Sequence, residues 1–175
     1  MNYNYILYVF YLNFVTDYRK QLELCSYGKN DPNFTKGLFG SVGSFIKIDG
    51  REAINSKSRG FTLATITREG NLGEIKRYDT WGSDDASIQL RDYLRSLPND
   101  TQLAGITYDS YDDHRATFHT EVRPILTRMG VDVSSRNNRN SLCFFLTIGK
   151  PELTKQNFAA SWHGPATMKC PLICK

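Results

Sequence analysis

The 175-residue sequence lacks the features that define several protein classes. It has no apolar run of the roughly 18 residues that a membrane-spanning helix requires, so we do not expect it to span a membrane. Its 13 glycines and 6 prolines are too few for a collagen-like or low-complexity chain. Basic residues form no dense run and the net charge is only +4, which argues against a nucleic-acid partner. The length suits a single packed domain.

Familiar catalytic and metal-binding patterns are also missing. The sequence contains no G-x-S-x-G nucleophile motif, and no G-K-[ST] follows the glycines at positions 37, 40 and 43. None of the three histidines stands beside a cysteine, and the cysteine spacing matches no zinc pattern. These absences argue against a cysteine-based zinc site and leave little material for nucleophilic catalysis, and we expect no cofactor.

The cysteines and the glycosylation sequons concern whether the chain enters the secretory pathway. The cysteines are Cys25, Cys143, Cys170 and Cys174. An even number permits two disulfides, and the late pair could staple the carboxyl terminus onto the fold; four buried thiols are the alternative. The tripeptides beginning at Asn33 and Asn99 would accept N-glycans if the chain enters the secretory pathway.

The first 39 residues are interpreted as an amino-terminal segment and residues 40–175 as the main domain. The apolar run at residues 5–12 has the length of a secretory signal core, although no basic stretch precedes it. Its tyrosines and phenylalanines suit a β-strand equally well. Both interpretations remain open, a signal remnant or a strand that leads into the domain.

Strands dominate the rest of the chain. Residues 44–48 alternate and end at Asp49-Gly50, the dipeptide most typical of a tight hairpin. Alternating or continuous apolar runs predict further strands at residues 60–67, 74–78, 102–108 and 142–148. The last of these is apolar throughout, which is typical of a central strand.

Two helices are predicted between the strands. Apolar residues recur at helical spacing after the potential N-cap at Ser83, until Pro98 ends the helix. A second helix is expected over residues 116–129, with Gly130 as its C-cap and Pro124 kinking it or resetting its first turn. The order of elements predicts an α+β fold, a compact β-sandwich of mostly antiparallel sheets with flanking helices.

The densest polar cluster follows the strand predicted at residues 102–108. Its ionisable members include Asp109, Asp112, Asp113 and His114. Such a group could hold a divalent cation or act as acid and base, as in a metal-assisted hydrolase. We favour the simpler interpretation, in which Asp112 or Asp113 caps the following helix beside a binding surface, because the calcium-loop pattern is incomplete.

A second polar cluster, at residues 136–141, precedes the last predicted strand. Its arginines and amides suit sugar hydroxyls and carboxylates, since they present several planar donors together; a solvated loop is the plainer alternative. Trp81 and Trp162 could stack on a sugar ring, but large aromatic side chains more often lie in a core.

The motif at residues 76–82, Lys-Arg-Tyr-Asp-Thr-Trp-Gly, resembles the ILEI/PANDER domain family. That family includes secreted cytokine-like proteins of the FAM-three type, hyaluronan-processing surface proteins and the stem region of a protein O-mannose glucosaminyltransferase. Further segments resemble the family in the same order: residues 44–50, 59–63, 88–97, 112–113, 121–130, 139–149 and 162–170.

This resemblance implies a secreted, extracellular module without catalytic activity of its own. In the stem-domain member, two arginines and an aspartate bind carbohydrate, and the matching positions here are Arg59, Asp112 and Arg139. The acidic turn is longer by three residues in this chain, so Asp109 could take the place of Asp112. The implied partner is a glycan, and the alternative is a cytokine-like protein that acts through a cell-surface receptor.

Overall fold

Nine strands and two helical segments make up residues 19–31, 43–111, 116–133 and 139–172, the parts of the chain that the computed structural model describes. The strands are β1 (Gln21–Gly28), β2 (Ser44–Ile48), β3 (Arg51–Ser56), β4 (Gly60–Ile66), β5 (Leu72–Tyr78), β6 (Gln102–Asp109), β7 (Ser141–Thr147), β8 (Lys150–Ala159) and β9 (Ala166–Pro171). The first helix is α1 (Asp84–Ser96), and the second segment is a π-helical turn η1 (Phe118–Val122) that continues into α2 (Arg123–Arg128).

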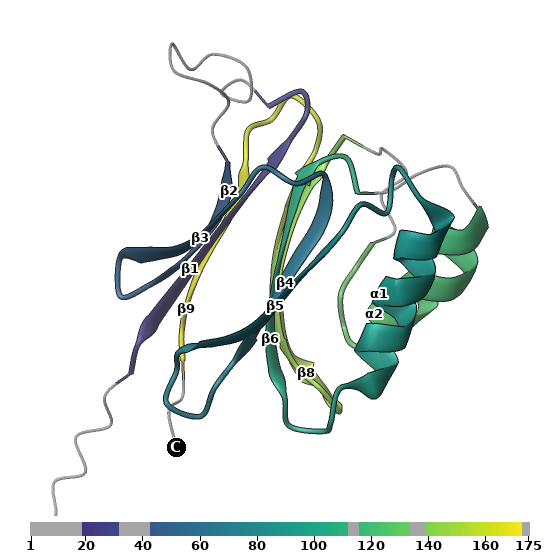
Figure 1. The fold of residues 1–175 in the computed structure, drawn as a ribbon. Helices are drawn as coiled ribbons and strands as arrows, with labels where there is room; N and C mark the ends of the chain where they lie inside the picture. The colour runs from purple at the N-terminus through teal and green to yellow at the C-terminus, as the bar shows by residue number, and fades with distance from the viewer. Residues whose placement is uncertain (1–18, 32–42, 112–115, 134–138, 173–175) are drawn as a thin grey trace, which may run out of the picture.

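The strands form one open, mixed sheet that folds into two layers. One layer contains β3, β2, β1 and β9, and the other contains β5, β4, β6, β7 and β8. A short parallel pairing of β1 with β6 joins them, with Tyr27 opposite Tyr108 and Gly28 opposite Asp109. Figure 1 shows both helices on the outer side of the second layer. The predicted α+β class with flanking helices is confirmed.

Two hydrophobic cores lie on the two sides of the second layer. Leu142 and Phe144 of β7 point towards the helices, whereas Cys143 and Phe145 point between the strand layers. β4 divides its side chains in the same way, with Phe61 on the helix side. Because both of its faces are buried, β7 is apolar from Leu142 to Leu146 instead of alternating, which is why the run at residues 142–148 indicated a central strand.

The two helical segments differ in their capping and in their regularity. Ser83 accepts a hydrogen bond from the Ala86 N–H at the start of α1, as the sequence predicts. The second helix is not regular over its predicted length. Pro124 has no N–H to donate to the preceding turn, and the Arg123 N–H bonds to the Phe118 carbonyl five residues earlier, which is the π-helical spacing.

β9 pairs with β1 antiparallel over six residue pairs. Beyond this ladder, the Leu172 N–H donates to the Lys20 carbonyl at 2.7 Å. The beginning and end of the described fold therefore lie side by side. Residues 1–18, including the apolar run at 5–12, lie outside the described residues.

The described cysteines are three buried free thiols, Cys25, Cys143 and Cys170. Burial raises the pKa of Cys25 to about 11 and that of Cys143 to about 12, so these thiols stay protonated at neutral pH. Cys174, the other half of the predicted late pair, lies outside the described residues. The disulfide at the carboxyl terminus remains a prediction.

Candidate functional site

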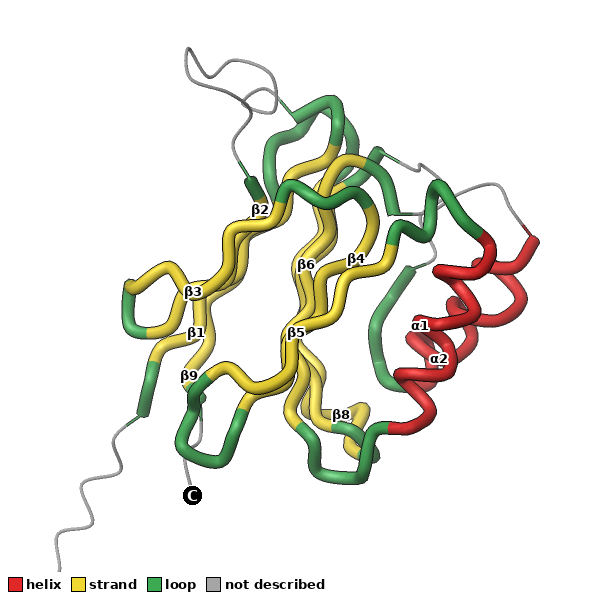
Figure 2. The backbone as a smooth tube through the Cα atoms, in the orientation of Figure 1, coloured by secondary structure: helices red, strands yellow, loops and turns green. Residues whose placement is uncertain are grey.

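The ends of several strands meet at one end of the two layers. Gly60 at the start of β4 pairs with Tyr108, so Arg59 lies beside the end of β6. On the other side of β6, Gly28 at the end of β1 pairs with Asp109, and the Lys29 N–H donates to the Asp109 carbonyl at 2.9 Å. Figure 2 shows loops gathered at this end, at the top of the view.

Arg139 reaches the same end from β7, which begins two residues later. A Cβ atom on Gly28 would overlap the Arg139 carbonyl oxygen, so the backbone at these two positions is in contact. The Arg139 Nη1 donates to the Asn30 Oδ1 at 3.3 Å. Two of the predicted residues, Arg59 and Arg139, thus lie at the same end of the layers as Asp109. Asp112, with Asp113 and His114, lies outside the described residues.

Arg59 is held in place by two neighbours that the sequence did not predict as site residues. Its Nε and Nη2 donate to the two carboxylate oxygens of Asp79 at 2.8 and 2.6 Å. Its guanidinium carbon lies 4.2 Å from the centre of the Trp81 ring. Asp79 also accepts from the Gly82 N–H at 2.9 Å, which fixes the turn before α1. Arg59 is therefore a pre-oriented cation at the rim of the site.

Arg139 belongs to a hydrogen-bond network that joins three loops. The Asn30 Nδ2 donates to the Ser161 Oγ at 2.8 Å. The Ser161 N–H in turn donates to the Asn140 Oδ1 at 2.7 Å. We refer to Asn30, Arg59, Asp109, Arg139 and Ser161 as the strand-end site. Neither Asn30 nor Ser161 was predicted, because an isolated small polar residue in a loop carries no pattern that distinguishes it.

Asp31 is buried beneath the strand-end site, with only 3% of its surface exposed. Its Oδ2 accepts from the Gly28 N–H at 2.7 Å, whereas its Oδ1 has no hydrogen-bond partner in the described structure. Burial raises the pKa of this carboxyl from 3.8 to about 6, although hydrogen bonds from the Gly28 N–H and the Ser141 side chain partly offset the effect.

Replacing Asp31 with asparagine should therefore stabilise the protein at pH 7.5. Because the pKa is raised in the folded state, folding favours the protonated carboxyl, and that contribution is fully present below pH 3.8 and lost as the pH rises through about 6. Urea unfolding should show Asp31→Asn more stable by about 2–3 kcal/mol at pH 7.5 and nearly equal to wild type at pH 3.5. An equal difference at both pH values would contradict the assignment.

Asp109 has a left-handed backbone, with φ of 63°, and its Oδ1 accepts from the Ser110 Oγ at 3.1 Å. Aspartate tolerates this conformation better than most residues, which suits a strand that must turn sharply at its end.

In the ranges that the structure describes, no group of three His, Cys, Asp or Glu side chains could hold a metal ion. The helices in the same ranges include none long and apolar enough to cross a membrane.

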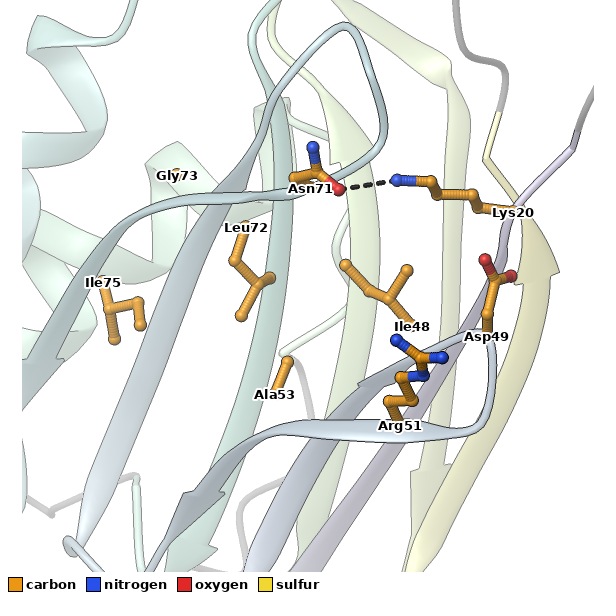
Figure 3. A pocket seen from close by; sticks show the side chains of 9 residues that line it. All are labelled: Lys20, Ile48, Asp49, Arg51, Ala53, Asn71, Leu72, Gly73 and Ile75. Atoms are coloured by element: carbon orange, nitrogen blue, oxygen red, sulfur yellow. Dashed lines mark hydrogen bonds between the residues drawn. The ribbon is translucent and has the colours of Figure 1, made fainter.

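A groove of about 880 Å³ lies away from the strand-end site, between the β2–β3 and β4–β5 hairpins. Figure 3 shows its lining, with Ile48 and Leu72 facing the groove and Lys20 donating to the Asn71 Oδ1 at 2.6 Å across it. Arg51 and Asp49 stand on one rim. None of the residues predicted to bind a ligand lines this groove.

Comparison with known proteins relates the chain to a family. A search of curated proteins finds no relative of this chain. A family model described as interleukin-like EMT inducer matches residues 59–150, more than half of the chain. The matched range runs from Arg59 through Arg139 to the first residue of β8. This confirms the resemblance drawn from the motif at residues 76–82, and the chain belongs to the ILEI family.

Proposed function

We propose that this protein is an extracellular binding module that recognises carbohydrate at the strand-end site and performs no chemistry on it. Membership of the ILEI family supports an extracellular module of the cytokine-like kind. The carbohydrate assignment rests mainly on one observation, the hydrogen-bonded network of Arg139, Asn30 and Ser161 at the ends of three different strands. Guanidinium and amide groups present fixed donors and acceptors together, which suits the hydroxyls of a sugar.

The residues of the strand-end site have different roles in this proposal. Arg139 and Asn30 lie in the exposed loops and hydrogen-bond the sugar directly. Asp112, or Asp109 in its place, accepts from sugar hydroxyls. Arg59 is oriented by Asp79, which occupies its Nε and one Nη2 hydrogen and balances its charge, so Arg59 offers its remaining N–H groups to the ligand at the rim. A shallow polar site of this kind gives modest affinity.

A glycan array tests the proposal, with wild-type protein beside two arginine variants. Wild type should bind at least one glycan saturably, and Arg139→Ala should weaken that binding by about tenfold, the effect of losing one or two charge-assisted hydrogen bonds. Arg128→Ala is the matched control, because Arg128 is an exposed arginine in the last turn of α2. If wild type binds no glycan, or if Arg139→Ala binds as well as wild type, the proposal is wrong.

The family description as interleukin-like favours one other function, signalling through a protein receptor. The two functions differ in what they need on the target cell. Binding of the labelled protein to cells should disappear after enzymatic removal of cell-surface glycans if the ligand is a sugar. Binding that persists on deglycosylated cells would favour the receptor.

A further inference from the structure

Trp162 is the most exposed large hydrophobic side chain of the described structure, with 71% of its surface in contact with solvent. It lies in the loop between β8 and β9. Its φ of 74° is left-handed, a conformation that is a genuine outlier for a bulky residue. Exposing an indole and straining its backbone both cost free energy, and nothing in the packing of the fold requires either of them.

The backbone around Trp162 is nevertheless firmly fixed. The preceding residue, Ser161, is buried and tied to Asn140 and Asn30 by hydrogen bonds of 2.7 and 2.8 Å. On the other side, the His163 N–H donates to the Ala160 carbonyl at 3.0 Å and closes a tight turn over the tryptophan. The loop therefore presents the ring to solvent in a predetermined place, as a preorganised binding residue requires.

This loop is continuous with the strand-end site. Ser161 adjoins Trp162 in the chain and shares the Asn30 side chain with Arg139, through contacts of 2.8 and 3.3 Å. A ligand that hydrogen-bonds Arg139 or Asn30 is thus next to the loop that carries the exposed ring. The arrangement combines polar donors with one flat apolar surface. A sugar ring is complementary to it, because its hydroxyls accept hydrogen bonds and its C–H groups form an apolar face.

We propose that Trp162 is the stacking platform of the glycan site and selects pyranoses that have an uninterrupted face of axial C–H bonds. This inference rests on the proposed carbohydrate function and adds the class of sugar. The polarised C–H groups of such a face meet the negative face of the indole ring, while the equatorial hydroxyls point outwards to Arg139 and Asn30. β-Gluco-configured units meet this requirement on both faces.

Two simple glycosides differ in this property and not in size. Methyl β-D-glucopyranoside has axial hydrogens only, on both faces of its ring. Methyl α-D-mannopyranoside carries an axial oxygen at C1 on one face and at C2 on the other, so both of its faces are interrupted. A site with a stacking platform should bind the two glycosides with different affinities. A site whose affinity depends only on the number of hydroxyl groups should bind them equally well.

Trp81 is the other tryptophan of the chain, and its replacement by phenylalanine keeps an aromatic ring beside the Arg59 guanidinium. It is 37% exposed and the Arg59 guanidinium lies over its ring at 4.2 Å. One face of Trp81 is therefore covered by a cation, while Trp162 makes no comparable ring contact with a described residue. Trp81→Phe also leaves Trp162 as the single tryptophan, so that its fluorescence reports on Trp162 alone.

The experiment measures binding of the two methyl glycosides by saturation-transfer NMR and by tryptophan fluorescence of Trp81→Phe. Methyl β-D-glucopyranoside should receive saturation mainly at its axial ring protons and should shift the Trp162 emission to shorter wavelength. Trp162→Gly, which accommodates the left-handed backbone, should weaken binding by about tenfold, while Trp162→Tyr should retain most of it. Methyl α-D-mannopyranoside should bind at least several-fold more weakly than the glucoside.

The outcomes separate this inference from the proposed function. If binding is lost in Arg139→Ala but unchanged in Trp162→Gly, the proposed carbohydrate binding is supported and the stacking role of Trp162 is wrong. If the mannoside binds as tightly as the glucoside, the selection by ring face is wrong. If wild type binds neither these glycosides nor any glycan of the array, the proposed function fails and the platform fails with it. Circular dichroism of each variant confirms that it is folded.

Discussion

Gly60→Ala is expected to lower the free energy of unfolding by about 3 kcal/mol or more. Two independent costs combine at this position. Gly60 has a φ of 89°, which L-residues adopt only under strain. In addition, a Cβ atom here would overlap the Tyr78 carbonyl oxygen and lie 2.9 Å from the Thr80 nitrogen. These are backbone atoms of β5 and the following turn, so they cannot move aside as the end of a side chain can.

Gly50→Ala is the matched control for this prediction. Gly50 also has a positive φ, of 74°, but a Cβ atom there would meet nothing within 4 Å. Only the backbone strain applies, and the expected cost is about 1 kcal/mol. Urea unfolding monitored by circular dichroism gives both values. Equal destabilisation by the two substitutions would show that the contact of Gly60 with β5 carries no cost, contrary to the structure.

Gly105→Ala is expected to have the second largest effect, about 2–3 kcal/mol. Gly105 lies in the middle of β6 and pairs with Phe144 on β7. A Cβ atom at position 105 would overlap the Phe144 ring, which is fully buried between the sheet and the helices. The ring has no space to move into, because the interior is closely packed, and therefore the strand pair must separate.

A second substitution tests this cause directly. Phe144→Leu shortens the side chain that the new Cβ atom meets, and alone it should cost about 1 kcal/mol. In the double variant Gly105→Ala/Phe144→Leu, the second change should recover most of the stability lost by the first, so that the two effects are far from additive. Additive losses in thermal or urea unfolding would mean that the alanine acts through something other than the ring.

Much of the fold could be predicted from the sequence because its strands and caps leave strong local patterns. The Asp49-Gly50 hairpin, the buried strand β7 and the N-cap at Ser83 are all present as predicted. β8 was missed, since most of its side chains are exposed and its polar sequence has no apolar face. β9 was missed because it is short and partly polar, and it becomes a strand only by pairing with β1.

The candidate site was less predictable, because it depends on contacts between distant residues. Arg59 and Arg139 were singled out through family resemblance, and the structure places both at the end of the layers where Asp109 lies. Their binding role stays a prediction. The pairing of Arg59 with Asp79 had no local signal, since it spans twenty residues. Trp162 was expected to lie in a core, as large aromatics usually do, and that expectation was wrong, because 71% of its surface is exposed in the loop between β8 and β9.

The hydrogen bond between Leu172 and Lys20 has a consequence for protein engineering. The segment from Lys20 to Leu172 begins and ends on neighbouring strands, whose spacing is about 4.8 Å. Such a segment can be grafted into a surface turn of a host protein without forcing the two ends of that turn apart. We expect the graft to keep its own fold and to carry the indole of Trp162 as a recognition element, away from the junction with its host.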